Sequence, residues 1–149
     1  MTGEIKFYRT KDPYGCFSNF SAHPVEIDGE VWRTTEHFFQ AQKFTDPEAH
    51  RKINSEESPM VAARIGRRRD FLLRPDWDSA KDDVMRKAVR AKVRQHADVR
   101  ETLLGTGDAI IIEHTANNSY WADGGDGSGK NMLGVILMEV RAALRSGHL

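Results

Sequence analysis

Hydrophobic and polar positions along the chain predict a protein built mainly from helices. One apolar stripe at helical spacing begins after Asp78 or Ser79 and ends near Gln95; its members are Val84, Met85, Ala88, Val89 and Val93. A second stripe predicts a final helix over about residues 132–145, with one face made of Met132, Ile136, Val140 and Leu144. Both patterns are typical of helices that cover an apolar interior.

Shorter helices are predicted from their start and stop signals. Thr34 or Thr35 can cap a helix that runs to about Phe44. Asp46-Pro47 and Ser58-Pro59 each place a capping residue before a proline at the first helical position. The helix that follows Pro59 is expected to end at Gly66, and a further short helix is expected over residues 98–104.

Strands are few. Residues 5–8 predict a short strand, and residues 109–112 predict a buried one. Residues 25–32 alternate in polarity around Asp28-Gly29, which is the strongest short-range signal for a hairpin. The fold class that follows is α+β: a predominantly helical single domain, residues 1–149, with a small β-sheet or hairpin.

A glycine-rich loop over residues 124–131 precedes the final helix. Glycines such as Gly124 and Gly125 let backbone N–H groups approach a ligand closely, and a helix N-terminus behind them favours anions. Tyr120 and Trp121 lie just before the loop and could stack on a base. The loop predicts either a nucleotide or ribose-phosphate site, or a flexible surface turn.

This loop is not a P-loop, although Gly124 to Lys130 spells most of one. Asn131 stands where the motif requires the Ser or Thr hydroxyl that ligates Mg²⁺. Asp123 and Asp126 would place negative charge beside the phosphates. A calcium loop is excluded as well, because the alternating oxygen ligands and the distal Glu are missing.

Composition narrows the class of protein. The 22 basic and 22 acidic residues balance, which argues against a dedicated duplex DNA or RNA binder. The single cysteine, Cys16, excludes a disulfide framework. No apolar signal or spanning segment is visible, so we expect a soluble, cytoplasmic protein without a membrane partner. No His, Cys or carboxylate cluster has ligand spacing, so we expect neither a metal nor another cofactor.

Glu36, Gln40 and Lys43 stand at positions i, i+4 and i+7 of a predicted helix and therefore share one face. A carboxylate and an amine backed by aromatic residues could form a partly buried reactive pair. The alternative is a stripe that faces water, in which Glu36 only complements the helix dipole. His37 offers no H-E-x-x-H spacing, so a zinc role is not expected.

The chain closely resembles the NADAR family and, within it, the YbiA-like N-glycosidases. The resemblance runs from about Phe7 to Leu144. Its motifs are Phe7-Tyr8, Tyr14-Gly15-x-Phe17-Ser18-Asn19-Phe20, Glu36-His37-x-Phe39-Gln40-Ala41-Gln42-Lys43-Phe44, Ser58-Pro59-Met60-Val61-Ala62-Ala63-Arg64-x-Gly66-Arg67, Trp77, Tyr120-Trp121-x-Asp123-Gly124-Gly125, Asn131-x-Leu133-Gly134 and Leu137-Met138-Glu139-x-Arg141.

The resemblance implies hydrolysis of an N-glycosidic bond to ribose, with no cofactor. It implies an acid at Glu36 and a reactive lysine at Lys43. The implied substrates are ribosylamino-pyrimidine phosphates of riboflavin synthesis or, alternatively, ADP-ribosylated guanine in nucleic acid. A non-catalytic ADP-ribose or nucleotide reader is the remaining alternative, although such a module would need neither Glu36 nor Lys43.

The resemblance also implies a set of substrate-binding residues: Tyr8, Asn19, Arg67, Trp77, Asn118, Trp121, Gly124 and Gly125. Asn118 departs from the family pattern, because relatives carry Asp there; since Asn cannot act as a base, the position is assigned to binding. Asp123 is the candidate second carboxylate if cleavage follows the two-carboxylate route of glycoside hydrolases. We prefer the route through Lys43, in which the amine attacks C1′ and forms an imine with the opened sugar.

Overall fold

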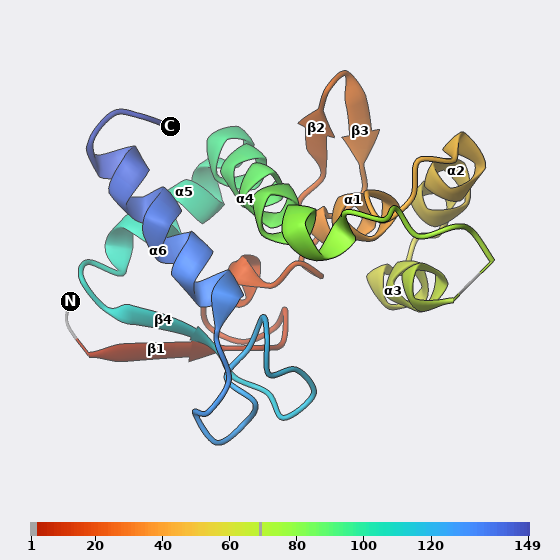
Figure 1. Ribbon diagram of the computed structural model, residues 1–149. Coiled ribbons are helices and arrows are strands. Elements are labelled where there is room, and N and C mark those ends of the chain that lie inside the picture. The colour runs from red at the N-terminus through yellow and green to blue at the C-terminus, as the bar shows by residue number, and fades with distance from the viewer. Residues whose placement is uncertain (1–2, 69) are drawn as a thin grey trace. The chain divides into compact units, whose positions relative to one another are not determined.

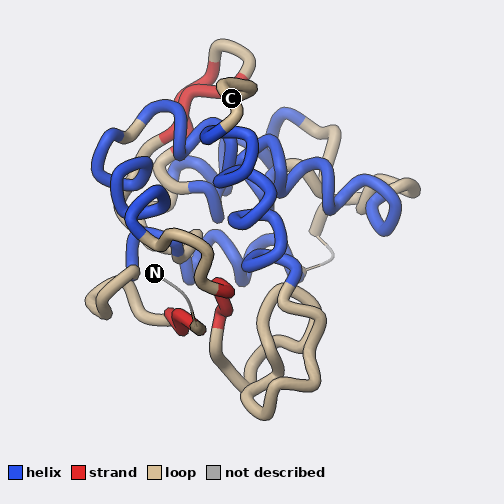
Figure 2. Tube along the Cα trace, turned by 90° about the vertical axis from the view of Figure 1, so that its left-hand side faces the viewer, coloured by secondary structure: helices blue, strands red, loops and turns tan. Residues whose placement is uncertain are grey.

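The computed structural model describes residues 3–68 and 70–149, which fall into two compact units. The first unit combines the residues up to Ser21 with Val93–Leu149, and the second is Ala22–Lys92. The predicted α+β class is confirmed, since helices make up most of the regular secondary structure in the described chain and the strands are short (Figure 2). That residues 1–149 form one domain stays a prediction.

The elements follow each other in the order β1 (Glu4–Phe7), the 3-10 helix η1 (Gly15–Phe17), β2 (Val25–Ile27), β3 (Glu30–Trp32), α1 (Thr35–Ala41), α2 (Pro47–Ser55), α3 (Pro59–Arg67), α4 (Trp77–Gln95), α5 (Ala97–Gly105), β4 (Ile110–Glu113) and α6 (Met132–Arg145). The boundary between the two units falls within α4. No helix in the described part of the chain is long and apolar enough to cross a membrane.

The hairpin of the second unit forms where the Asp-Gly signal predicts it. Strands β2 and β3 pair antiparallel, with Val25 opposite Trp32 (Figure 1). Asp28 and Gly29 have φ angles of 54° and 83°. Two successive residues in the left-handed region make the turn that matches the twist of a two-residue hairpin.

Helices α1, α2 and α3 of this unit begin at the predicted caps, whereas α4 begins at Trp77, ahead of the predicted start at Asp78 or Ser79. Thr34, Asp46 and Ser58 each accept a backbone N–H in the first turn of α1, α2 and α3, respectively. These three helices, the hairpin and α4 contribute to one apolar cluster: Val25, Ile27, Trp32, Phe38, Ala41, Phe44, Ala49, Ile53, Ala62, Ile65, Ala88 and Ala91. Burial of this cluster is the main force that holds α1 in place.

Two predicted helix ends differ from the structure, by about three residues for α1 and by one residue for α3. Helix α1 ends at Ala41 rather than near Phe44, because the N–H groups of Lys43 and Phe44 bond to carbonyls three residues back and tighten the chain into a turn. Helix α3 does not stop at Gly66 but includes it and ends at Arg67. Gly66 is therefore not a helix-terminating residue, and its small size has another cause.

The first unit is built on a parallel pair of strands. Strand β1 lies beside β4, with Ile5 opposite Ile111, and α6 packs against β4 (Figure 1). The prediction of a fully buried strand was wrong, because Ile111 is buried whereas Ile110 is half exposed. Successive side chains of a strand point to opposite faces, so the neighbours of a buried residue face outward.

Helix α6 begins at the predicted position and is fixed to β4 by Asn131. The Asn131 amide accepts from the Glu113 N–H at 3.0 Å and donates to the Ile111 carbonyl at 2.9 Å. A Cβ atom on Gly134 would lie 2.0 Å from the Ile111 carbonyl oxygen, so only glycine permits this approach of helix to strand. The loop from β4 to α6 is thereby held at both ends.

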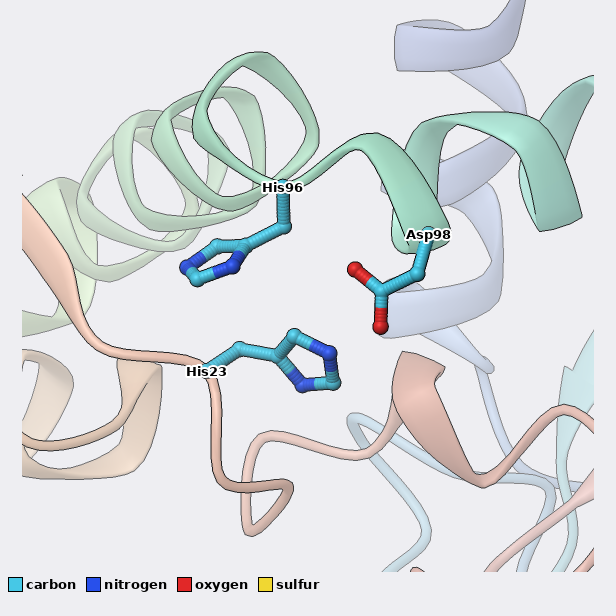
Figure 3. Close-up of side chains that lie close together, drawn as sticks. All are labelled: His23, His96 and Asp98. Atoms are coloured by element: carbon cyan, nitrogen blue, oxygen red, sulfur yellow. The ribbon is translucent and has the colours of Figure 1, made fainter.

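Helix α5 is preceded by His96, and Asp98 lies in its first turn (Figure 3). An acidic side chain in the first turn complements the positive end of the helix dipole. Helix α5 spans Ala97–Gly105, so the predicted span of 98–104 was correct to within one residue at each end.

Candidate active site

The face of helix α1 that holds Glu36 and Gln40 is buried. Every residue of the helix is buried, and Glu36 and Gln40 are only 9% and 6% exposed. The Gln40 amide Nε2 donates to Glu36 Oε2 at 2.7 Å. The alternative in which this face is exposed to water is therefore wrong for Glu36 and Gln40, because packing of α1 against α2, α3 and β3 encloses them.

Burial raises the pKa of Glu36 above its ordinary value of 4.5, because the charged form loses its water. The hydrogen bond from Gln40 and the positive charges of Lys43 and Arg67 oppose this rise without cancelling it. A carboxyl that keeps its proton to higher pH can donate it to a leaving group. The geometry thus suits Glu36 to a role as general acid.

Lys43 lies in the turn after α1 and is partly exposed. Its Nζ donates to the Gly66 carbonyl of α3 at 3.3 Å, and its own carbonyl accepts from the Arg74 N–H at 2.8 Å. Arg67 follows Gly66 and is exposed at the end of α3. Glu36 on α1, Lys43 in the turn after it and Arg67 on the neighbouring α3 therefore belong to one unit.

Trp77 opens α4 and packs against the aromatic face of α1. Its ring lies 5.1 Å from the Phe39 ring, centre to centre, at an interplanar angle of 60°. The indole is 9% exposed. Edge-on aromatic packing of this kind adds to the stability that burial already supplies. Trp77 therefore supports the helix that carries Glu36.

Replacement of Trp77 by Ala is expected to lower the free energy of unfolding by about 3–5 kcal/mol, as for other large aromatic residues cut back to Ala in a core. Trp77→Phe keeps a ring against Phe39 and should lose less. Urea unfolding of both variants measures the difference. If Trp77→Ala is as stable as the native chain, the ring is not a packing residue.

His37 is a core residue rather than a metal ligand candidate. It is fully buried; its Nδ1 lies 2.8 Å from Thr34 Oγ1, and its Nε2 lies 2.7 Å from the Glu56 carbonyl oxygen. Burial lowers the pKa of His37 below 6.5, and the positive charge of Arg33 lowers it further, against the opposing bond to Glu56. The ring thus ties the start of α1 to the end of α2.

Stability is expected to fall as pH drops below about 6.5, because unfolded His37 binds a proton that the folded protein excludes. The stabilisation by neutral His37 is present above that pH and is lost as pH falls through the lowered pKa. His37→Gln cannot titrate and should show a shallower dependence. Urea unfolding between about pH 5 and 8 tests this, with the exposed His148→Gln as control. Equal slopes for His37→Gln and the native chain would contradict it.

In the first unit, Asp123 organises the loop from β4 to α6. It is buried; its Oδ1 accepts from the Thr115 and Gly125 N–H groups at 3.1 and 2.9 Å, and its Oδ2 lies 2.7 Å from His114 Nδ1. Burial favours a higher pKa for Asp123, but the hydrogen bonds from His114, Gly125 and Thr115 outweigh it and lower the pKa. Asp123 is therefore an ionised anchor with both oxygens engaged.

The rest of the loop is also internally bonded. Asn118 Oδ1 accepts from the N–H groups of Tyr120 and Trp121, both at 2.8 Å. Gly124 and Gly125 have φ angles of 75° and 86°, which suit glycine alone without strain. Hence the glycines shape this loop through backbone conformation, and Asn118 fixes the two aromatic residues before it.

A cavity of about 390 Å³ lies between this loop and the exposed face of β1 and β4. Lys6, His114, Asp123 and Gly125 are among the residues that line it. At the end of β1, the exposed Tyr8 hydroxyl accepts from Asn117 Nδ2 at 3.0 Å, and Asn19 is a buried residue of the same unit.

The sequence did not single out His114 as a partner of Asp123; that pairing requires the fold.

The predicted site residues divide between the units. Glu36, Lys43, Arg67 and Trp77 lie in the second unit, and the first unit holds Tyr8, Asn19, Asn118, Trp121, Asp123, Gly124 and Gly125. Sequence reasoning placed Gly66 in a family motif and at a helix end, but it did not assign the residue to the site. In the second unit, the buried Glu36, its amide partner Gln40 and Lys43, whose charge acts on Glu36, form a candidate reactive group.

A model of the NADAR domain matches residues 6–145 of the chain. The chain belongs to the NADAR domain family. It is 56% identical over 140 residues to the N-glycosidase YbiA of Escherichia coli, covering 94% of this chain and 88% of that protein. A solution NMR structure of E. coli YbiA matches with a TM-score of 0.89 and 54% identity, covering 98% of this chain and 86% of that one.

More distant members of the family also match. An N-glycosidase of Nostoc punctiforme is 44% identical over 145 residues, covering 95% of this chain and 93% of that protein. A riboflavin biosynthesis protein of Vibrio vulnificus is 38% identical over 145 residues, covering 97% of this chain and 40% of that longer protein. The relatives of this chain thus include proteins named as N-glycosidases and proteins named for riboflavin biosynthesis.

Proposed function

We propose that the chain is an N-glycosidase that hydrolyses the C–N bond between a ribose phosphate and an amine-bearing pyrimidine, with Glu36 as general acid and Lys43 as nucleophile. The observation that carries the proposal is the buried Glu36 carboxyl, whose raised pKa keeps a proton available beside an amine. The names of the E. coli and Nostoc relatives support the reaction class.

The reaction proceeds in two halves. Glu36 gives its proton to the leaving nitrogen while the C–N bond breaks, and the neutral Lys43 amine forms a bond to C1′. The sugar ring then opens: the C1′–O4′ bond breaks, a proton moves from Nζ to the ring oxygen, and an imine forms between Nζ and C1′. Water then adds to the imine, Glu36 takes back a proton, and the free ribose phosphate departs with Lys43 restored as an amine.

The substrate class follows from the leaving group and the relatives. The Vibrio relative is named for riboflavin biosynthesis, which supports a ribosylamino-pyrimidine phosphate as substrate. We assign Asp123 to holding the glycine loop, because backbone and ring N–H groups occupy both of its oxygens. Tyr8, Asn19, Arg67, Trp77, Asn118, Trp121, Gly124 and Gly125 are proposed to bind or support the substrate.

Product analysis distinguishes the candidate functions. The purified protein is incubated with a ribosylamino-pyrimidine phosphate and, separately, with an oligonucleotide that carries ADP-ribosylated guanine. We expect release of the free pyrimidine amine and ribose phosphate, detected by mass spectrometry. Preferential release of ADP-ribose would replace the proposed substrate with the alternative one. Binding without turnover of either substrate would identify a non-catalytic reader.

A further inference from the structure

Gly66 and Gln40 are packed against each other beside the catalytic groups. A Cβ atom on Gly66 would lie 2.0 Å from Oε1 and 2.7 Å from Cδ of Gln40. Gly66 is a residue of α3 and does not have a positive φ, so no turn requires a glycine there. Glycine in a helix interior is less favourable than Ala. The space taken by the Gln40 amide is thus the physical reason for glycine at this position.

The same two residues hold the two proposed catalytic groups. The Gln40 amide Nε2 donates to Glu36 Oε2 at 2.7 Å, and the Gly66 carbonyl accepts from Lys43 Nζ at 3.3 Å. The other amide atom, Gln40 Oε1, is buried and has no hydrogen-bond partner in the described part of the chain.

The orientation of the Gln40 amide determines which protonation state of Glu36 it stabilises. With Nε2 toward Glu36, Gln40 is a donor, and a donor stabilises the carboxylate rather than the protonated acid. A 180° turn of the amide would place Oε1 toward Glu36 instead, which suits only the protonated acid. The observed orientation therefore matches the state of Glu36 after it has given up its proton.

We propose that Gln40 and Gly66 are positioning residues for the hydrolysis: Gly66 leaves the space in which the Gln40 amide stands, and the amide donates to the Glu36 carboxylate that proton transfer creates. This inference rests on the proposed function. In this account Gln40 lowers the pKa of Glu36 by stabilising its carboxylate, and Gly66 acts by leaving room for the Gln40 amide. Neither residue contacts the substrate in this account; Gln40 acts through Glu36, and Gly66 acts through Gln40.

The effect of Gln40 on Glu36 is separable from the charges around it. In the described part of the chain, the charged groups that act on Glu36 are Lys43, in the turn after α1, and Arg67, on α3. Both lower the pKa of Glu36, as does the Gln40 hydrogen bond, whereas burial raises it. Gln40→Met keeps a long unbranched side chain, removes the donor and leaves both charges in place.

The test is an NMR titration of the Glu36 side-chain carboxyl, which does not depend on turnover. We expect the pKa of Glu36 to be higher in Gln40→Met than in the native chain. Gly66→Ala should raise it in the same direction, because the new methyl group displaces the amide. The double variant should show no further rise, since both changes remove one hydrogen bond. Gly105→Ala, where a Cβ meets nothing within 4 Å, is the matched control.

Activity supplies a second readout. A descending limb in the pH profile of turnover, governed by Glu36, should move to higher pH in Gln40→Met; a merely structural role would lower turnover equally at every pH. An unchanged Glu36 pKa in Gln40→Met overturns the inference, as do additive shifts in the double variant. If Gly66→Ala fails to fold, the Gln40→Met titration decides alone. Failure of the proposed function is distinct: it would appear as turnover that does not require Glu36.

Discussion

Turnover is expected to fall on the order of 10²–10⁴-fold in Glu36→Gln, the range typical for loss of a general acid. The amide keeps the shape of the side chain and can still accept from Gln40 Nε2, but it has no proton to give to the leaving nitrogen. Steady-state hydrolysis of a ribosylamino-pyrimidine phosphate measures the loss. Glu30→Gln, an exposed carboxylate on β3 of the same unit, is the matched control and should retain full activity.

Glu36→Gln should still fold, and the pH dependence of its stability should reflect the burial of the Glu36 carboxyl. Because the pKa of Glu36 is raised, its stabilisation of the fold is present below the ordinary value of 4.5 and is lost as pH rises through the raised pKa. Gln does not titrate, so the variant should be at least as stable as the native chain near neutral pH. Near-native turnover in a folded Glu36→Gln protein would remove Glu36 from the chemistry.

Lys43→Arg is expected to abolish turnover, although it preserves the positive charge near Glu36. A guanidinium stays protonated at any accessible pH and has no lone pair with which to attack C1′. Lys87→Arg on α4 is the matched control, since Lys87 is an exposed lysine of the same unit that pairs with Asp28. Substrate binding to Lys43→Arg, measured by calorimetry, should be retained in part.

An active Lys43→Arg protein would show that Lys43 only positions the substrate. The two-carboxylate route through Glu36 and Asp123 would then be the better account. That route predicts that Asp123→Asn loses turnover while the loop keeps its structure. Asp123 anchors two backbone N–H groups and the His114 ring, so its replacement should instead loosen the loop.

Local signals in the sequence predicted most elements of the fold. Thr34, Asp46 and Ser58 cap the helices they were expected to cap, and Asp28-Gly29 forms the hairpin turn. Each of these features depends on a few consecutive residues, because a cap or a two-residue turn is decided by its own hydrogen bonds and φ angles. The apolar stripe of α6 also predicted its helix, because the pattern repeats over several turns.

Features that depend on residues far apart in the chain were not predictable. Nothing near Gly66 reveals that the Gln40 side chain occupies its Cβ position. Burial of Glu36 depends on how α1 packs against its neighbours, so the spacing of Glu36 and Lys43 left open whether their face met water. Exposure of Ile110 likewise depends on the pairing of β4 with β1 in a two-stranded sheet.

Reductive trapping tests the central claim most directly. Borohydride is added to the protein during turnover of a ribosylamino-pyrimidine phosphate, and the digested protein is examined by mass spectrometry. The imine between Lys43 Nζ and the opened ribose is reducible, so the account predicts a stable mass gain of one sugar phosphate on the peptide that contains Lys43. Absence of this adduct under saturating substrate, with turnover intact before the borohydride is added, would contradict the role of Lys43 as nucleophile.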